Sequence, residues 1–114
     1  MIQDCRTRAD YEKLSAESRQ RPVFLFKHST RCPISAGRWR VFEQFAATES
    51  RASFYRLLVV EDRAVSQYVA QECGVRHQSP QVILYWEEKP IWHTSHYSIT
   101  EDEMLEALSK VVPI

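Results

Sequence analysis

Residues 23–35 read VFLFKHSTRCPIS. The apolar residues that open this segment do not alternate with polar ones, which predicts a β-strand buried on both faces over Val23–Phe26. Polar residues follow, and then Pro33, a residue favoured at the first position of a helix because its missing N–H needs no partner there. Apolar side chains recur at helical spacing from Trp39 onward, so we predict a helix over Pro33–Ala47 with Cys32 as its N-cap.

Cys32 has the sequence surroundings of a reactive thiol. The thiolate is the reactive form of cysteine, and a helix N-terminus favours it because unpaired backbone N–H groups and the positive end of the helix dipole lie there. Ser35 falls in the first turn, where its hydroxyl or its amide can donate to the sulfur. The cations nearby in the sequence are Lys27, Arg31, Arg38 and Arg40. We therefore predict that Cys32 is an accessible nucleophile rather than a buried, inert cysteine.

The rest of the chain predicts elements on both sides of this segment. They are an irregular start over 1–8 that can add a short edge strand, a helix over Ala9–Ser18, a strand over Phe54–Val60, a helix that ends at Gly74, a strand over Val82–Trp86, a four-residue turn over 87–90, a short strand from Ile91, and a helix that begins with a capping box over Thr100–Glu103. The βα crossovers should be right-handed and give parallel strands, whereas the last hairpin adds antiparallel ones.

These elements predict an α/β fold. It has a four-stranded mixed sheet, built in the order β-α-β-α-β-β-α, with helices on both faces and an extra N-terminal helix. Periodicity leaves the strand order open. The 114 residues, 44% of them apolar, fit one domain over residues 1–114.

Composition excludes several classes of protein. The chain has 15 Lys and Arg residues and 15 Asp and Glu residues, so its formal net charge is zero. No apolar run approaches the ~20 residues that are needed to span a bilayer. The charged N-terminal segment lacks the apolar stretch of a signal peptide, which predicts a cytoplasmic protein. The 3 cysteines are too few and too scattered for a disulfide framework.

Charge is unevenly distributed, because no acidic residue occurs between Glu17 and Glu43. The basic residues of that interval are Arg19, Arg21, Lys27, Arg31, Arg38 and Arg40. The interval is either a solvated basic face or a site that attracts anions. Nucleic acid is not favoured as a partner, since the whole chain is neutral and aromatic residues do not interleave with the basic ones.

The other cysteines and the histidines carry weaker signals. Cys73 shares an apolar helix face and is interpreted as a packing residue, and Cys5 lies in the irregular start and is interpreted as incidental. Either could still resolve a disulfide if the fold brings it within reach of Cys32. A metal site is not favoured, because no second cysteine completes a common zinc set with His93 and His96.

Two further residues near the expected strand ends leave alternatives open. His28 follows the first buried strand and either lines the site or caps the strand with its polar side outward. Pro80 opens a strand expected to be central, where proline is normally excluded because it cannot donate to the ladder. It is either an ordinary loop proline or part of a cis Ser79–Pro80 bond in a special turn.

Three segments together identify a resemblance. Residues 27–35 read KHSTRCPIS, residues 75–81 read VRHQSPQ and residues 92–100 read WHTSHYSIT. They resemble the monothiol bacilliredoxin family of the bacillithiol system, and the likeness runs from about Pro22 to the C-terminus. The first segment is its most specific part, since it carries more information than a bare C-x-x-S pattern.

This resemblance implies a thioredoxin-like fold in which Pro80 is cis and packs beside Cys32. The implied activity is that of a thiol–disulfide oxidoreductase that removes bacillithiol, a small thiol carrying malate and glucosamine, from mixed disulfides on proteins. Cys32 would be the nucleophile, and Ser35 would stand where dithiol relatives have a resolving cysteine. The residues expected to stabilise the thiolate or hold the substrate are His28, Thr30, Arg31, Pro33, Ser35, Ser79 and Pro80.

A monothiol site also follows from the residues, because Cys32 cannot form an internal disulfide with Ser35 and a second small thiol must release it. The expected partners are S-thiolated cytoplasmic proteins and the low-molecular-weight thiol, with no resident cofactor, metal, nucleic acid or membrane. Two other hypotheses stay open. One is a non-catalytic thioredoxin-like binding or stress-response module, since a fold does not fix a function. The other is a thiol peroxidase, for which Ser29 stands where a threonine is expected.

Overall fold

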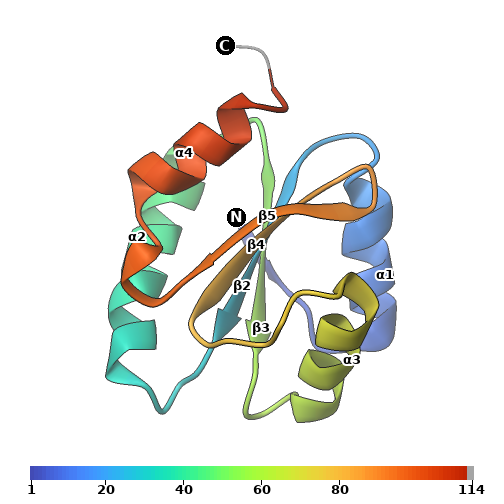
Figure 1. Cartoon of the computed structure of the whole chain (residues 1–114), viewed down its shortest axis with the longest axis vertical. Coiled ribbons are helices and arrows are strands. Elements are labelled where there is room, and N and C mark those ends of the chain that lie inside the picture. The colour runs from blue at the N-terminus through green and yellow to red at the C-terminus, as the bar shows by residue number, and fades with distance from the viewer. Residues whose placement is uncertain (113–114) are drawn as a thin grey trace.

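β2 (Val23–His28) is the central strand of a five-stranded sheet in the computed structural model, which describes residues 1–112 (Figure 1). The strand order is β1-β3-β2-β4-β5. β1 (Ile2–Asp4), β3 (Ser53–Leu58) and β2 are parallel, and β4 (Gln81–Trp86) is antiparallel to both of its neighbours, β2 and β5 (Lys89–Ser95). All residues of β2 are buried, as the unbroken apolar run predicts.

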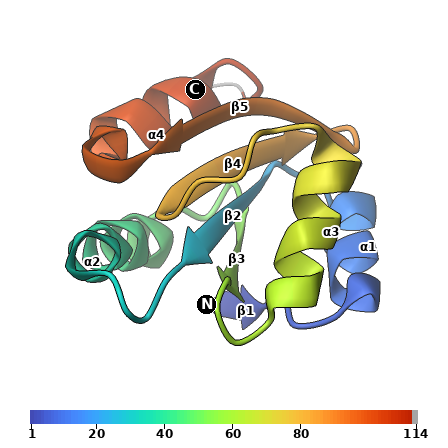
Figure 2. The same cartoon turned by 60° about the horizontal axis from the view of Figure 1, so that its bottom comes forward.

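The helices cover both faces of the sheet. α2 (Pro33–Thr48) and α4 (Glu101–Ser109) lie on one side, and α1 (Arg8–Glu17) and α3 (Arg63–Cys73) lie together on the other (Figure 2). A short 3₁₀ helix, η1 (His96–Ser98), connects β5 to α4. Within residues 1–112, no helix has the length and apolar character needed to cross a membrane.

Successive residues of β2 point to opposite faces and enter two separate cores. Phe24 and Phe26 pack with aromatic residues of α2 and β3 and with Met104 of α4. Val23 and Leu25 pack on the other face with residues of α1, α3, β3 and β4. The strand that leads to Cys32 is therefore held by both layers of the molecule.

The irregular start predicted over residues 1–8 supplies an additional strand, so the sheet has five strands and not four. β1 pairs with β3 in parallel, and the Cys5 amide then donates to the Arg56 carbonyl at 2.8 Å. Cys5 is fully buried among α1 and β3 residues. The interpretation of Cys5 as an incidental residue in a loose segment is wrong, because a strand of three residues is too short to show periodicity in the sequence.

Two predicted helix ends are confirmed, the C-cap of α3 and the N-cap of α4, whereas α1 runs one residue earlier than the predicted Ala9–Ser18 and α2 ends at Thr48 and not at Ala47. Gly74 terminates α3 with a positive φ of 72°, and the Thr100 hydroxyl accepts a hydrogen bond from the Glu103 amide at 3.2 Å at the start of α4. The turn between β4 and β5 is shorter than predicted, because only Glu87 and Glu88 lie between the strands and both have positive φ. The Ser18 carbonyl and hydroxyl accept hydrogen bonds from their amides and hold this turn.

Candidate active site

Cys32 is the N-cap of α2, and Pro33 occupies the first helical position, as predicted. The thiol is free and half-buried, and the Cys32 carbonyl accepts from the Ala36 amide at 3.1 Å. Because Pro33 has no N–H, the amides of Ile34 and Ser35 are the first donors at this end of the helix, and neither has a helical carbonyl to bond. The positive end of the helix dipole therefore lies at the cysteine.

The Ser35 side chain is fully buried beneath this helix start and bonds to β2 and the loop after it. Its Oγ accepts from the Ser29 amide at 3.0 Å and lies 2.6 Å from His28 Nδ1. A hydroxyl can donate one hydrogen bond and accept two, so this contact is made either by the hydroxyl donating to Nδ1 or by Nδ1–H donating to the hydroxyl, according to the tautomer of His28. The Ser35 hydroxyl therefore contacts His28 and Ser29 in place of the expected Cys32 sulfur, and of the two donors expected from Ser35 the amide remains as the candidate.

His28 lies inside the molecule, which decides between its two interpretations. Its ring is buried and stacks on Trp39 with ring centroids 5.5 Å apart. Burial lowers the pKa of His28, and the charge of Arg56 lowers it further. A neutral imidazole can accept the Ser35 proton at Nδ1, so His28 and Ser35 form a buried polar pair under the first turn of α2.

Thr30 and Arg31 are exposed residues of the loop before Cys32. The Thr30 hydroxyl donates to the Glu61 carboxylate at 2.9 Å, and this hydrogen bond lowers the pKa of Glu61. Val59 donates its amide to the His28 carbonyl at 2.9 Å in the same region. The loop that carries the cysteine is thus attached to the loop that follows β3.

The Ser79–Pro80 peptide is cis, which confirms one of the two interpretations of this proline. Gln81 pairs with Lys27, so the register places Pro80 opposite His28, at the end of β2 from which the chain runs to Cys32. Pro80 lies just before β4, so its missing N–H does not interrupt the hydrogen bonds of that strand. The Pro80 carbonyl accepts from the His96 amide at 3.0 Å. The Ser79 Oγ is buried and has no hydrogen-bond partner within residues 1–112.

Lys27 is a feature that the sequence interpretation missed. It was counted among the cations near Cys32, but its side chain points to the opposite face of β2 and is fully buried. Its Nζ donates to Gln81 Oε1 at 3.0 Å, and Gln81 Nε2 donates to the Arg76 carbonyl at 3.1 Å. Burial lowers the pKa of Lys27 to about 8. The available signal was weak, because the strand was predicted over Val23–Phe26 and the structure extends it to His28, which places Lys27 inside it.

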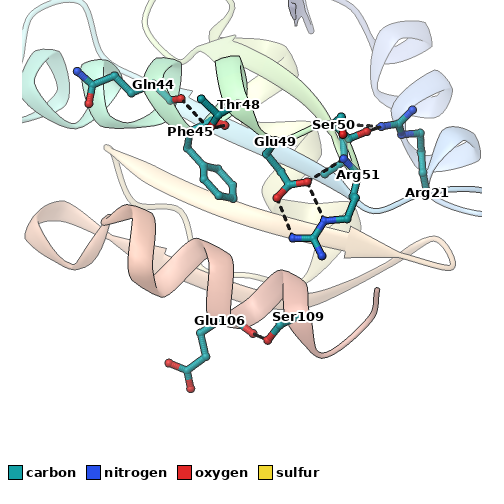
Figure 3. A network of polar contacts seen from close by, with 10 residues as sticks. Arg21, Gln44, Phe45, Thr48, Glu49, Ser50, Arg51, Glu106 and Ser109 are labelled. Atoms are coloured by element: carbon teal, nitrogen blue, oxygen red, sulfur yellow. Dashed lines mark hydrogen bonds and ion pairs between the residues drawn. The ribbon is translucent and has the colours of Figure 1, made fainter. Parts of the chain in front are cut away.

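The basic interval does not form one surface around Cys32. Arg19 pairs with Glu88 at 3.2 Å, and Arg21 donates to backbone carbonyls just before β3. Figure 3 shows Arg21 beside Ser50 and close to the Glu49–Arg51 pair, at the end of the sheet where β2 begins. Arg38 donates to the Ile99 carbonyl at 2.9 Å. Of the two interpretations of the basic interval, these contacts fit solvated and structurally paired cations that are dispersed over the surface. They do not fit one continuous anion-binding site.

The two other cysteines are free thiols in different settings. Burial, with smaller contributions from Asp10 and Asp62, raises the pKa of Cys5 to about 12. Cys73 ends α3, packs against the same core and accepts from the Val75 amide at 3.4 Å. The packing role predicted for Cys73 fits this position, although the residue is only partly buried.

Comparison with known proteins gives a family and a fold. The family model described as monothiol bacilliredoxin BrxC matches residues 3–104. A solved structure described as a candidate oxidoreductase with a thioredoxin fold has a TM-score of 0.84 and 28% identity, covering 93% of this chain and 92% of its own. The thioredoxin of Malassezia sympodialis has a TM-score of 0.77 at 18% identity, covering 96% and 90%.

Thioredoxin f from spinach chloroplasts, in its short form, has a TM-score of 0.76 at 17% identity, with 96% and 91% covered. At these low identities the two thioredoxins establish the fold alone. The predicted thioredoxin-like fold is therefore confirmed.

Proposed function

This chain belongs to the monothiol bacilliredoxin family, and from that membership we propose that it removes bacillithiol from mixed disulfides on cytoplasmic proteins. The family and the thioredoxin fold indicate a thiol redox function. The observation that carries the finer proposal is the position of Cys32 as N-cap of α2, directly before Pro33, with a serine at position 35.

In the first step the Cys32 thiolate attacks the bacillithiol sulfur of the mixed disulfide. A new S–S bond forms between Cys32 and bacillithiol, the original S–S bond breaks, and its electron pair leaves on the sulfur of the target protein. That sulfur takes a proton from water. The target protein is reduced, and Cys32 carries the bacillithiol.

In the second step a free low-molecular-weight thiol regenerates the enzyme. Its thiolate attacks the bacillithiol sulfur on Cys32, which forms a small-molecule disulfide and returns the Cys32 thiolate. The free thiol is the reductant of the whole cycle. A small thiol is required because Ser35 cannot supply a sulfur for an internal disulfide.

The chain's own residues support the attacking sulfur. We assign the Ile34 and Ser35 amides to the stabilisation of negative charge on Cys32, since they point out of the helix start. The His28–Ser35 pair then acts as a positioning pair, because it ties the first turn of α2 to the end of β2. Thr30 positions the intervening loop through Glu61.

Transfer of bacillithiol to the protein tests this proposal directly. A bacillithiolated test protein is incubated with the wild type, Cys32→Ala and Cys73→Ser, and each chain is weighed intact. We expect the adduct on the wild type and on Cys73→Ser, the matched control, and none on Cys32→Ala. Equal accumulation on Cys32→Ala would show that Cys32 is not the nucleophile. No adduct on any chain would favour a binding module without catalysis.

A further inference from the structure

Lys27 and His28, the last two residues of β2, reach to opposite faces of the sheet. On one face, His28 contacts Ser35 in the first turn of α2. On the other, Lys27 is fully buried and its Nζ donates to Gln81 Oε1 at 3.0 Å. Gln81 is the first residue of β4 and is itself only 2% exposed. The end of β2 is therefore bonded to the start of α2 on one face and to the start of β4 on the other.

Gln81 extends this attachment to the preceding segment, residues 76–80. Its Nε2 donates to the Arg76 carbonyl at 3.1 Å and so joins the two ends of the segment. In the part of the chain that the structure describes, the segment has one other hydrogen bond, which the Pro80 carbonyl accepts from the His96 amide at 3.0 Å. The buried Ser79 Oγ bonds to nothing within residues 1–112. The Gln81 side chain is thus one of two anchors of this segment.

The register places this segment beside the candidate active site. Because Lys27 pairs with Gln81, Pro80 lies opposite His28. The His28 side chain contacts the first turn of α2, the helix that Cys32 caps. In Figure 1 the chain between α3 and β4 turns back toward the end of β2. A shift of this segment therefore moves Pro80 relative to the helix turn that holds the cysteine.

A lysine is suited to fixing the Gln81 side chain, because an ammonium has three donors and no acceptor. It draws Gln81 Oε1 toward itself and leaves Nε2 for the Arg76 carbonyl. An apolar side chain would fill the same space without the cost of a buried charge, and no carboxylate pairs with Lys27 within residues 1–112. What an apolar residue would not supply is the fixed orientation of the Gln81 amide.

We propose that Lys27 and Gln81 are positioning residues for the exchange at Cys32, because together they hold residues 76–80 in place beside the first turn of α2. The proposal rests on the proposed function for the reaction itself. Both residues act through the backbone of the segment, from the face of the sheet opposite to α2. Loss of either contact should impair exchange with a protein substrate and leave the intrinsic reactivity of the Cys32 thiol unchanged.

Two substitutions separate positioning from the buried charge. Lys27→Met removes both the charge and the donor to Gln81. Gln81→Glu pairs the charge with a carboxylate but removes the Nε2 that bonds the Arg76 carbonyl. The two changes act on the buried charge in opposite ways and weaken the same anchor, so we expect the same defect from both. Lys89→Met, at an exposed position of β5, is the matched control, and urea unfolding shows whether each variant is folded.

NMR relaxation of backbone amides tests the anchor without requiring catalysis. In Lys27→Met and Gln81→Glu, the order parameters of His77 and Ser79 should fall from about 0.85, typical of a rigid backbone, toward about 0.6. The order parameter of Val59, whose amide bonds to the His28 carbonyl, should not change. Wild-type order parameters at residues 77–79 in either variant would overturn the proposal, as would a fall that includes Val59.

Exchange kinetics give a readout that a merely structural role would not move. Lys27→Met and Gln81→Glu should lower kcat/KM for release of bacillithiol from the test protein at least about tenfold, since a displacement of about 1 Å near a reacting group can cost about a hundredfold. The rate at which iodoacetamide alkylates Cys32, followed by peptide mass, should keep its wild-type value. Wild-type kcat/KM in Gln81→Glu, or an equal loss of alkylation rate, would overturn the positioning role. Absence of release by the wild type would refute the proposed function alone, and the relaxation measurement would still decide whether the anchor exists.

Discussion

Replacing Lys27 by methionine should stabilise the protein at neutral pH and destabilise it at high pH. Lys27 is fully buried, donates only to Gln81, and has its pKa lowered from the usual 10.5 to about 8 by burial. Below pH 8 both the folded and the unfolded chain carry the ammonium, and the folded state bears the full burial penalty. Between pH 8 and 10.5 the unfolded chain binds more protons, so the free energy of unfolding rises with pH.

The two pKa values set the size of the effect. Their separation corresponds to about 3 kcal/mol of penalty on the charged lysine. Methionine removes that penalty but leaves the buried Gln81 oxygen without its donor, which costs about 1–2 kcal/mol. Lys27→Met should therefore be about 1–2 kcal/mol more stable than the wild type at pH 7. Above pH 10 it should be less stable by a similar amount.

Urea unfolding at several pH values between 7 and 10.5 measures this difference. Other groups that titrate in this range, such as Cys5, are present in both chains and cancel in the comparison. Lys89→Met, at an exposed position, is the matched control and should follow the wild type at every pH. A difference between Lys27→Met and the wild type that does not change with pH would refute the account of Lys27 as a buried, unpaired cation.

Three further changes give separate tests. Burial raises the pKa of Cys5 from 9.0 to about 12, so the folded chain holds the thiol proton more tightly than the unfolded chain does. This difference contributes about 4 kcal/mol to the free energy of unfolding below pH 9, and the contribution is lost as the pH rises to about 12. Urea unfolding of Cys5→Ala should lack this loss. Ser35→Cys adds a thiol one helical turn from Cys32, within disulfide reach. It should release bacillithiol from Cys32 without added thiol, and a persistent adduct by intact mass would contradict this. Gly74→Ala places a side chain at a φ of 72° with no atom within 4 Å of the new Cβ, so thermal unfolding should show a loss of about 1 kcal/mol from conformation alone; an unchanged Tm would contradict it.

The long periodic elements could be predicted from the sequence because each contains its own signal. The start of α2 is the clearest case, since a proline after a polar loop marks both the N-cap and the first helical position. The sequence left the edge strand over residues 1–8 as an option only, because the existence of β1 depends on pairing with β3, which lies some fifty residues away in the chain. Strand order depends on the same kind of distant contact.

For the candidate site, the sequence proposes residues but not their contacts, and the roles of those residues stay predictions. Cys32, Ser35 and Pro80 are recognisable from local sequence, and the structure brings all three to one end of the sheet. That the Ser35 hydroxyl faces His28 depends on how α2 packs against β2. The sign of a side chain's charge also does not reveal its burial, which is why Lys27 was grouped with surface cations.

The position of β2 between two cores has a consequence for how the cysteine loses its activity. The helices on neither face of the sheet can detach while β2 stays folded, because alternate residues of β2 pack into the core on each side. Amide protons of β2 should therefore exchange with solvent only when the entire chain unfolds. On heating, the reactivity of the Cys32 thiol should disappear in the same transition as the far-ultraviolet signal, with no earlier inactivation step.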